Sequence, residues 1–344
     1  MVPDDLTSDW FSTVFDIDVQ VATMKRIGDG LVGLNLRVVL VHDGGAPDSV
    51  VVKLPSLDET SKATGIALRN YEREVKFYEH IADTVDIRVP VCHHGQWHED
   101  TGDFVLVLED MAPAEQGDQI TGCSGERASD AVRALADLHG PRWGDESLHE
   151  HEFLQRRDGD RSAIELTGIW NMVLPGFLAT YADRLDEPSL ALVEEFGRHV
   201  GPWVAEREGA WTVTHGDYRL DNLLFATPEG GPTVTAVDWQ TPGHGVPIAD
   251  LSYFCGAGLL TDDRRHLERE LVTTYVDRLA GHGVSVEWDW VWEQYVRDAF
   301  AGVVMAVAAS QLVGGSERSV EMFGAMATRH LQHALDLDAL DLVR

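Results

Sequence analysis

The segment 212–238 constrains the fold of this 344-residue chain more than any other. His215, Asp217 and Asn222 lie in one short loop between two apolar runs, and Asp238 ends a later apolar run. A polar loop between apolar runs predicts a strand, a loop and then a short hairpin. The sequence therefore places two carboxylates, an amide and an imidazole on neighbouring segments.

These side chains suit phosphoryl transfer. One carboxylate can orient an attacking hydroxyl and accept its proton, while an amide oxygen and a second carboxylate can hold Mg²⁺ on nucleotide phosphates. We therefore expect Asp217 to be catalytic and Asn222 and Asp238 to be metal ligands. An imidazole can act as a base at neutral pH, but the place of His215 before Gly216 favours a supporting role.

Two short motifs carry a family resemblance. Residues 215–222, His-Gly-Asp-x-x-x-x-Asn, resemble the catalytic loop of the aminoglycoside phosphotransferase and choline kinase-like family. Residues 238–240, Asp-Trp-Gln, stand where protein kinases carry Asp-Phe-Gly, and the final Gln resembles the ecdysteroid-kinase-like branch. The resemblance implies a protein-kinase-like fold and a kinase for small molecules, with ATP and Mg²⁺ as cofactors.

The first third of the chain is predicted to be rich in β-strands and the remainder mostly helical. Alternating or continuous apolar residues indicate strands, and apolar spacings of three and four indicate helices. The strands are expected at 16–21, 34–38, 50–52 and 104–108, and the helices at 69–81 and from 129 onward. We therefore expect an α+β, bilobal protein-kinase-like fold. A small β-rich nucleotide-binding lobe would span 1–110, and a larger, mostly helical catalytic and substrate-binding lobe 111–344.

Gly28, Gly30 and Gly33 fit the pattern G-x-G-x-x-G. In a dinucleotide-binding turn this pattern leads into a helix, whereas here it leads into the alternating apolar residues of 34–40. A glycine-rich hairpin over nucleotide phosphates is therefore favoured, and a plain β-turn is the alternative. A nicotinamide-dependent oxidoreductase would rest on these glycines alone and lacks the required helix.

A lysine and a hinge segment complete the predicted nucleotide site. Lys53 ends an apolar run, and a lysine on a buried strand is costly unless its charge is used. The resemblance implies that Lys53 contacts the α- and β-phosphates and pairs with Glu74, with Glu72 as the competing partner. Glu109 and Met111 lie in a segment that resembles the hinge between lobes, whose backbone would hydrogen-bond adenine. A simple strand exit is the alternative.

The chain carries 58 acidic and 27 basic residues, a formal net charge of -31. This balance argues against nucleic acid or an anionic membrane as a partner. We expect a small-molecule hydroxyl acceptor. The acidity would suit a cationic acceptor such as an amine, and the alternative is that it serves only solubility or suits a salty cytosol. Trp288, Trp290 and Trp292 would form either an aromatic wall for an apolar or quaternary-amine ligand or a packing cluster.

Other features predict a cytoplasmic protein. The three cysteines show no paired spacing, and the N-terminus lacks the basic and apolar regions of a signal peptide. The apolar stretch 299–313 falls short of the roughly 18 residues that a spanning helix requires, so a buried core helix is expected. His93, His94 and His98 are expected in a solvated turn, not at a metal site.

Two further functions remain open at this stage. A degenerate kinase that binds a nucleotide or metabolite without turnover would carry the same motifs. A protein kinase is disfavoured because the segment between Asp238 and Asp250 is too short for a long activation loop that docks peptides.

Overall fold

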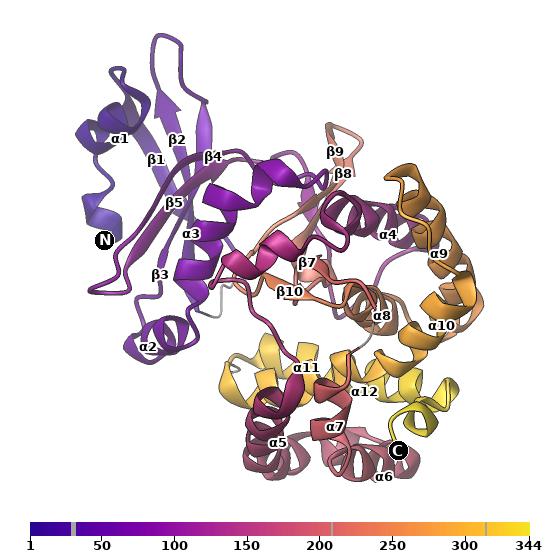
Figure 1. Cartoon of the computed structure of the whole chain (residues 1–344). Helices are drawn as coiled ribbons and strands as arrows, with labels where there is room; N and C mark the ends of the chain where they lie inside the picture. The colour runs from indigo at the N-terminus through magenta and orange to yellow at the C-terminus, as the bar shows by residue number, and fades with distance from the viewer. Residues whose placement is uncertain (29–31, 208, 314) are drawn as a thin grey trace.

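A five-stranded antiparallel sheet forms the N-terminal part of the computed structural model, which describes residues 1–28, 32–207, 209–313 and 315–344 (Figure 1). Its strand order is β1-β2-β3-β5-β4. The strands are β1 Gln20–Arg26, β2 Gly33–Val41, β3 Ser49–Pro55, β4 Cys92–Trp97 and β5 Phe104–Glu109. The helices beside this sheet are α1 Ser8–Phe15, α2 Glu59–Ala67 and α3 Asn70–His80.

Strand β5 is buried on both of its faces. Val105 and Val107 belong to the apolar cluster that contains Phe11 of α1. The alternate residues of the strand, Phe104 and Leu106 among them, pack in the cluster that contains α3. Because successive side chains of a strand point to opposite faces, a continuous apolar run fits a strand that is covered on both sides.

The remainder of the chain is mainly helical. Its helices are α4 Gly125–His139, α5 Gly159–Tyr181, α6 Glu187–Phe196, α7 Val200–Ala205, α8 Pro247–Gly258, α9 Thr261–Gly281, α10 Trp288–Arg297, α11 Ala299–Leu312 and α12 Glu317–Asp336. Its short strands are β6 Glu115–Gln116, β7 Thr212–Thr214, β8 Leu223–Thr227, β9 Gly230–Ala236 and β10 Gly243–Gly245. They form a three-stranded sheet, β6-β8-β9, and a pair, β10-β7.

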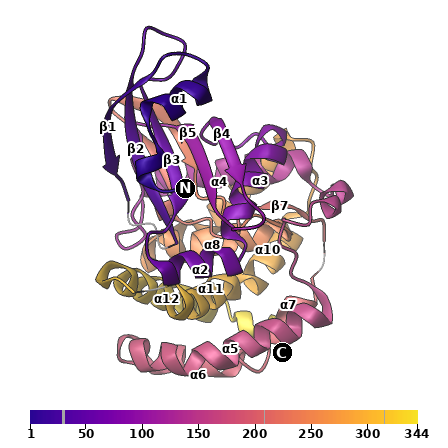
Figure 2. The same cartoon turned by 90° about the vertical axis from the view of Figure 1, so that its left-hand side faces the viewer.

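Two apolar clusters hold the helical part together. One joins α4, α8 and α9 to α3 and to the short strands, so it continues into the N-terminal sheet. The other joins α5, α6 and α7 to α11 and α12. Figure 2 shows this second group at the far end of the molecule from the five-stranded sheet, with α11 and α12 above α5. The short strands lie between the sheet and these helices.

The α+β class and the kinase-like arrangement of the prediction are confirmed. The prediction of a strand at 16–21 was partly wrong, because Asp16 ends α1 in a left-handed conformation and β1 begins only at Gln20. The prediction of a turn at His93 and His94 was also wrong, since both lie in β4. The division of the chain at residue 110 stays a prediction. Within the described ranges, no helix is long and apolar enough to cross a bilayer.

Candidate active site between the sheet and the helices

A cavity of about 860 Å³ lies between the five-stranded sheet and the helical part. Most of the predicted site residues line it: Gly28, Gly33, Lys53, Glu109, Met111, Asp217, Asn222 and Asp238. Glu74 does not line the cavity but lies behind Lys53. Gly30 falls outside the described residues. The structure thus gathers residues from positions 28 to 238 of the chain around one space.

Lys53 on β3 makes two ion pairs. Its Nζ lies 2.5 Å from Oε1 of Glu74 and 3.1 Å from Oδ1 of Asp238. Burial by itself would lower the pKa of Lys53, but the charges of Asp238 and Glu74 outweigh burial and raise the pKa above its ordinary value. Lys53 therefore stays protonated and links the sheet, α3 and the segment after β9.

Glu74 is the partner of Lys53 because α3 turns it inward. Its side chain is fully buried, and burial raises the pKa of this carboxyl despite the opposing effect of Lys53. Glu72, the competing candidate, points elsewhere and pairs with Arg69 at 2.7 Å and Lys76 at 2.9 Å. Both glutamates are buried, but Glu74 faces Lys53 on β3, whereas Glu72 is neutralised by the two basic residues on or beside its own helix.

Asp250 at the start of α8 fixes the loop after β7. Its two carboxylate oxygens accept hydrogen bonds from the backbone N–H of His215 at 2.7 Å and of Gly216 at 3.1 Å. Gly216 has a φ of 76°, and a Cβ there would lie 2.4 Å from the carbonyl oxygen of Thr241. Only glycine fits that position without a shift of the backbone.

His215 holds the loop against the segment that carries Asp238. Its Nε2 lies 3.1 Å from the carbonyl oxygen of Val237 and must donate to it, while Nδ1 accepts from the N–H of Asp217 at 3.3 Å. Both ring nitrogens are therefore used inside the protein. This geometry supports the expected supporting role and leaves neither nitrogen free to act as a base.

Four hydrogen bonds orient the carboxylate of Asp217. Arg219 Nε donates to both oxygens at 3.0 and 3.1 Å, Tyr253 donates to Oδ1 at 2.7 Å, and Asn222 Nδ2 donates to Oδ2 at 2.9 Å. Arg219 also donates to Asp221 at 2.8 Å. A carboxylate held in this way has one fixed orientation at the cavity wall.

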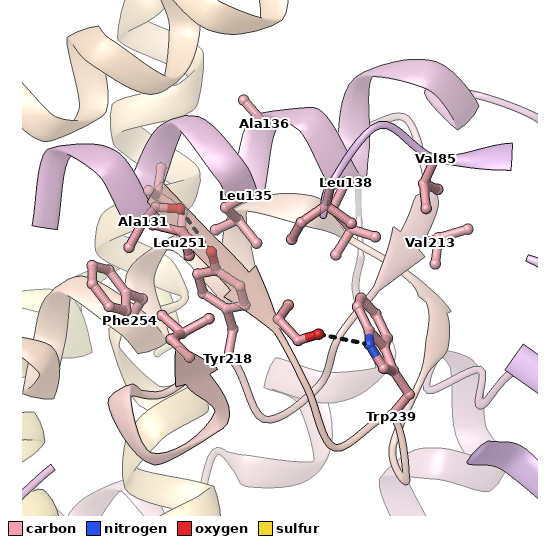
Figure 3. Packing of buried hydrophobic residues seen from close by; sticks show 14 of the residues in the cluster. Val85, Ala131, Leu135, Ala136, Leu138, Val213, Tyr218, Trp239, Leu251 and Phe254 are labelled. Carbon is pink, nitrogen blue, oxygen red and sulfur yellow. Dashed lines mark hydrogen bonds between the residues drawn. The ribbon is translucent and has the colours of Figure 1, made fainter. Parts of the chain in front are cut away.

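Two glutamines outside the loop form hydrogen bonds with its C-terminal part. The buried Gln119 accepts from the N–H of Leu220 through Oε1 at 2.9 Å, and its own N–H donates to Oδ1 of Asp221 at 2.9 Å. Gln116 Nε2 donates to the carbonyl of Asp221. Within the loop, Tyr218 points into the apolar cluster and donates to the carbonyl of Ala131, 2.7 Å away on α4 (Figure 3).

Trp239 anchors the segment that carries Asp238. Its ring stacks on Phe77 of α3 with centroids 3.8 Å apart, and its Nε1 donates to the carbonyl of Ala236 at 3.3 Å (Figure 3). Asp238 itself has a φ of 67°. This left-handed conformation allows the carboxylate of Asp238 to face Lys53 while the side chain of the next residue, Trp239, is buried.

The end of β5 forms the part of the cavity wall next to β3, the strand that carries Lys53. The Glu109 carboxylate is 2.5 Å from Arg88 and accepts from the N–H of Val91 at 3.0 Å. The backbone carbonyl of Met111 accepts from the N–H of Ala114 at 2.9 Å. The N–H of Glu109 donates to the carbonyl of Val91 at 2.8 Å. Among the described residues the N–H of Met111 has no such partner, so it is the backbone group that remains a candidate for contact with a ligand.

The glycines of the first hairpin lie beside Lys53. Gly28 has a φ of 65°, and Gly33 begins β2 opposite Pro55 at the end of β3. The chain continues from Gly33 as a strand and not as a helix. This connection fits the predicted hairpin and excludes a dinucleotide-binding turn at this place.

The donor atoms near Asp238 fit a magnesium ion bound together with phosphates. Asn222 gives its amide N–H to Asp217, so its Oδ1 is the atom left to accept or coordinate. Among the described residues, no three His, Cys, Asp or Glu side chains are grouped to hold a metal ion by themselves. Mg²⁺ keeps few protein ligands and takes phosphate oxygens and water for the rest.

Two other residues of the site were not predicted from the sequence, whereas the packing alternative for the tryptophans is the one observed. Tyr253 and Gln119 carry no motif, and only the three-dimensional packing of α8 and of the segment before α4 brings them to the loop. The tryptophans of α10 do not line the cavity. Trp288 and Trp292 stack on each other with centroids 5.4 Å apart, beneath Arg269. They form a packing cluster.

Comparison with known families gives one extended match. The family model described as "Phosphotransferase enzyme family" matches residues 25–292. Among curated proteins, the acyl-CoA dehydrogenase family member 10 of Mus musculus is 43% identical over 49 residues, which is 14% of this chain. That match spans only 4% of the relative's length.

Solved structures with the same fold are distant in sequence. The GDP complex of wild-type aminoglycoside 2'-phosphotransferase-IIIa is 14% identical, with 93% of this chain and 96% of that chain covered and a TM-score of 0.56. A microcompartment-associated aminopropanol kinase is 15% identical, with 96% and 97% covered and a TM-score of 0.50. At this identity the likeness shows the fold alone. The predicted closeness to the ecdysteroid-kinase-like branch stays a prediction.

Proposed function

This chain belongs to the phosphotransferase enzyme family, and on that premise we propose that it transfers the γ-phosphate of ATP to a hydroxyl group of a small molecule. The observation that carries the proposal is the meeting of Lys53, Asp217, Asn222 and Asp238 on the wall of one cavity. These groups are the ones that phosphoryl transfer uses for charge stabilisation and positioning.

The nucleotide would lie under the first hairpin and against β5. Lys53 would bind the α- and β-phosphates, since its ammonium group is charged and already held by Glu74. Gly28 and Gly33 let the backbone of the hairpin approach phosphates closely. The backbone N–H of Met111 would hydrogen-bond the base.

Asn222 and Asp238 would hold Mg²⁺. When bound, this ion neutralises the charge of the phosphate oxygens and orients them. Lys53 now lies on Oδ1 of Asp238, so that carboxylate already serves as the partner of a cation. Its pKa is lowered because the charge of Lys53 outweighs the effect of burial, which keeps it ionised and able to coordinate.

Asp217 would orient the acceptor hydroxyl and take its proton. Arg219, Tyr253 and Asn222 fix the carboxylate, so the position of the attacking oxygen is set before the acceptor binds. Positioning of this kind matters because the transition state is loose and offers little covalent chemistry to the protein.

Replacement of the catalytic carboxylate tests the proposal. Asp217→Asn should lower the rate of ADP release in the presence of an acceptor by about 10²–10⁴-fold, the usual contribution of a positioned proton acceptor. The thermal shift produced by MgATP should persist, because Lys53 and Asp238 are untouched. Asp263→Asn, on the exposed start of α9, is the matched control and should leave both readouts unchanged.

The outcomes separate the proposal from a binding module. Unchanged turnover in Asp217→Asn would refute the role of this residue. A wild-type protein that gains stability with MgATP but transfers phosphate to no acceptor would favour a degenerate kinase instead.

A further inference from the structure

The cavity extends from the proposed nucleotide site into the helical part, where its wall is mainly apolar. This wall comes from α5, α11 and α12 and includes Leu166, Ile169, Val304, Met305, Ala308 and Met322. Small residues on α11, Ala301 and Ala308 among them, leave room between these helices. This part of the cavity, next to Asp217 and Tyr253, is where an acceptor would lie.

Helix α11 explains why the wall is apolar. The buried side of the helix, with Phe300, Val303 and Val307, packs in the cluster of α5 to α7 and α12. Val304 and Met305, which also pack against this cluster, line the cavity together with Ala308. A helix that is apolar all round is normally buried all round. An apolar surface left facing a cleft is typical of a ligand-binding wall.

The charged residues of the cavity differ from those of the whole chain. Seven arginines and lysines line it, and seven aspartates and glutamates, whereas the chain has 27 basic and 58 acidic residues. The basic residues are Arg37, Lys53, Arg156, Arg157, Arg207, Arg219 and Arg318. The cavity is thus locally enriched in positive charge on a strongly acidic protein.

Most of these arginines are already paired with carboxylates. Arg156 pairs with Asp158 at 2.9 Å, Arg207 with Asp298, and Arg318 with both Asp118 and Asp221 at 3.4 Å. Arg157 is different. Among the described residues its hydrogen-bond partner is Gln155, whose amide oxygen is neutral, at 2.9 Å, and it forms no ion pair.

Like charges surround Arg157. Arg157 is an exposed residue of the cavity wall, and its partial loss of water and the like charge of Arg207 both lower its pKa. Arg73 on α3 is near enough that Arg157 contributes to lowering the pKa of Arg73 to about 10, after burial and Arg69. The buried Nε of Arg73 has no hydrogen-bond partner among the described residues. An anion bound to Arg157 in the cavity would reduce the repulsion between these arginines and give Arg157 the charged partner that the other cavity arginines already have.

We propose that the acceptor is an anionic, largely apolar alcohol, such as a hydroxylated carboxylic acid, whose anionic group binds Arg157 and whose apolar body lies against α5, α11 and α12. This inference rests on the proposed function, because it names the acceptor class of the same site. It replaces the cationic acceptor that the acidic composition favours. Net charge acts over a distance that salt screens, while Arg157 acts by contact.

Binding of simple probes with one chain length and different head groups tests the proposal. We would titrate decanoate, decyl phosphate, decanol and decylamine into the full-length protein by calorimetry, with MgATP present and absent. Decanoate should bind at least about tenfold more tightly than decanol, because a charge-assisted hydrogen bond contributes roughly 1.5–3 kcal/mol. Decylamine should bind more weakly than decanol. The affinities of decyl phosphate and decanoate, compared with each other, show whether the site prefers a phosphate or a carboxylate.

Variants test separately whether Arg157 binds the anionic group and whether the apolar wall binds the alkyl chain. Arg157→Ala should remove the preference for decanoate over decanol and raise the KM of a hydroxydecanoate acceptor, with the KM of ATP unchanged. The control is Arg156→Ala, which removes a neighbouring cavity arginine that already has Asp158, and it should keep the preference. Ala308→Phe should fill the apolar part, so that decanoate loses affinity while butanoate does not.

Each result bears on the proposal. Tighter binding of decylamine than of decanoate, or no binding of any probe, would overturn it. A rise in the KM of ATP in Arg157→Ala, with the acceptor KM unchanged, would assign Arg157 to the nucleotide and also overturn it. If decanoate binds as expected while MgATP neither stabilises the protein nor reacts, the proposed transferase function fails and the anion site remains.

Discussion

At the scale of single residues, Lys53 is the cation that neutralises two carboxylates of the site. It is buried between two carboxylates of different elements, Glu74 on α3 and Asp238 after β9. The sequence could identify it because a lysine at the end of a buried strand needs a partner. The sequence could not identify Arg157, since an arginine in a polar loop before a helix has no such pattern.

Removal of the lysine charge should destabilise the protein. Lys53→Met leaves the buried carboxylate of Glu74 and the half-buried one of Asp238 without a counter-charge. The free energy of unfolding should fall by about 3–5 kcal/mol, most of it from Glu74, because Asp238 is reached by water. The double variant Lys53→Met with Glu74→Gln should recover part of this loss, because one of the carboxylates is then neutral. Urea denaturation of the three proteins measures both effects. Equal stability of the single and double variants would show that Lys53 acts by some means other than this ion pair.

Among the elements, α8 and α11 approach α12 closely at two glycines. A Cβ at Gly256 or Gly302 would lie 2.6 or 2.0 Å from the ring of His330. His330 in turn stacks on Tyr253, with centroids 5.3 Å apart, and Tyr253 donates to Asp217. The glycines therefore let α12 support a residue that orients the catalytic carboxylate.

This close approach should make stability depend on pH. Burial, and after it Arg329 and Arg264, lower the pKa of His330 to about 3. The folded state thus keeps the ring neutral where the unfolded chain, with a pKa near 6.5, binds a proton. The stability that the neutral His330 contributes to the folded state is fully present above about pH 6.5, and it is lost as the pH falls toward 3. Between pH 7 and 5, His330 alone should lower the free energy of unfolding by about 2 kcal/mol.

The control for this effect is His330→Asn, which cannot titrate in that range. Urea denaturation at the two pH values should show a larger loss for the wild type than for the variant. The same loss in both proteins would assign the pH dependence to other groups, with the neighbouring His333, whose pKa burial also lowers, as the first to test.

The elements were predicted where apolar periodicity was strong. The strands near 34–38 and 104–108 and the helix near 69–81 all appear with small changes at their ends. The order of α1 and β1 was not predicted, because 8–15 is too short to show helical periodicity and residues 16–21 alternate polar and apolar side chains as a strand does. The catalytic loop was predicted from its motif. Its supports were not, because Gln119 and Tyr253 are brought to it only by the fold.

At the scale of the whole molecule, the net negative charge opposes the binding of anions at the proposed site. A net charge of -31 repels every anion, whether nucleotide or acceptor. The cavity lining does not share this excess of negative charge, because its seven basic residues balance its seven acidic ones. The surface, in contrast, keeps a large excess of carboxylates that repel one another in the folded state.

Added salt should therefore stabilise the protein. Between roughly 0.01 M and 0.1 M NaCl the screening length falls from about 30 to about 10 Å, which weakens the repulsion among surface carboxylates. The melting temperature should rise over this interval at pH 7, as differential scanning calorimetry would show. Near the sequence pI of about 4.6 the increase should be smaller. A fall in melting temperature with salt at pH 7 would mean that attractive ion pairs dominate instead.

The loop at 215–222 owes its shape to residues that it does not contain. Asp250 binds its first two amides, Gln119 and Gln116 bind its far end, and the carbonyl of Val237 holds His215. An eight-residue peptide moved into another scaffold would carry the motif without this shape. A designer who wishes to transplant the activity would have to move α8, the segment before α4 and the hairpin together, as one three-part graft.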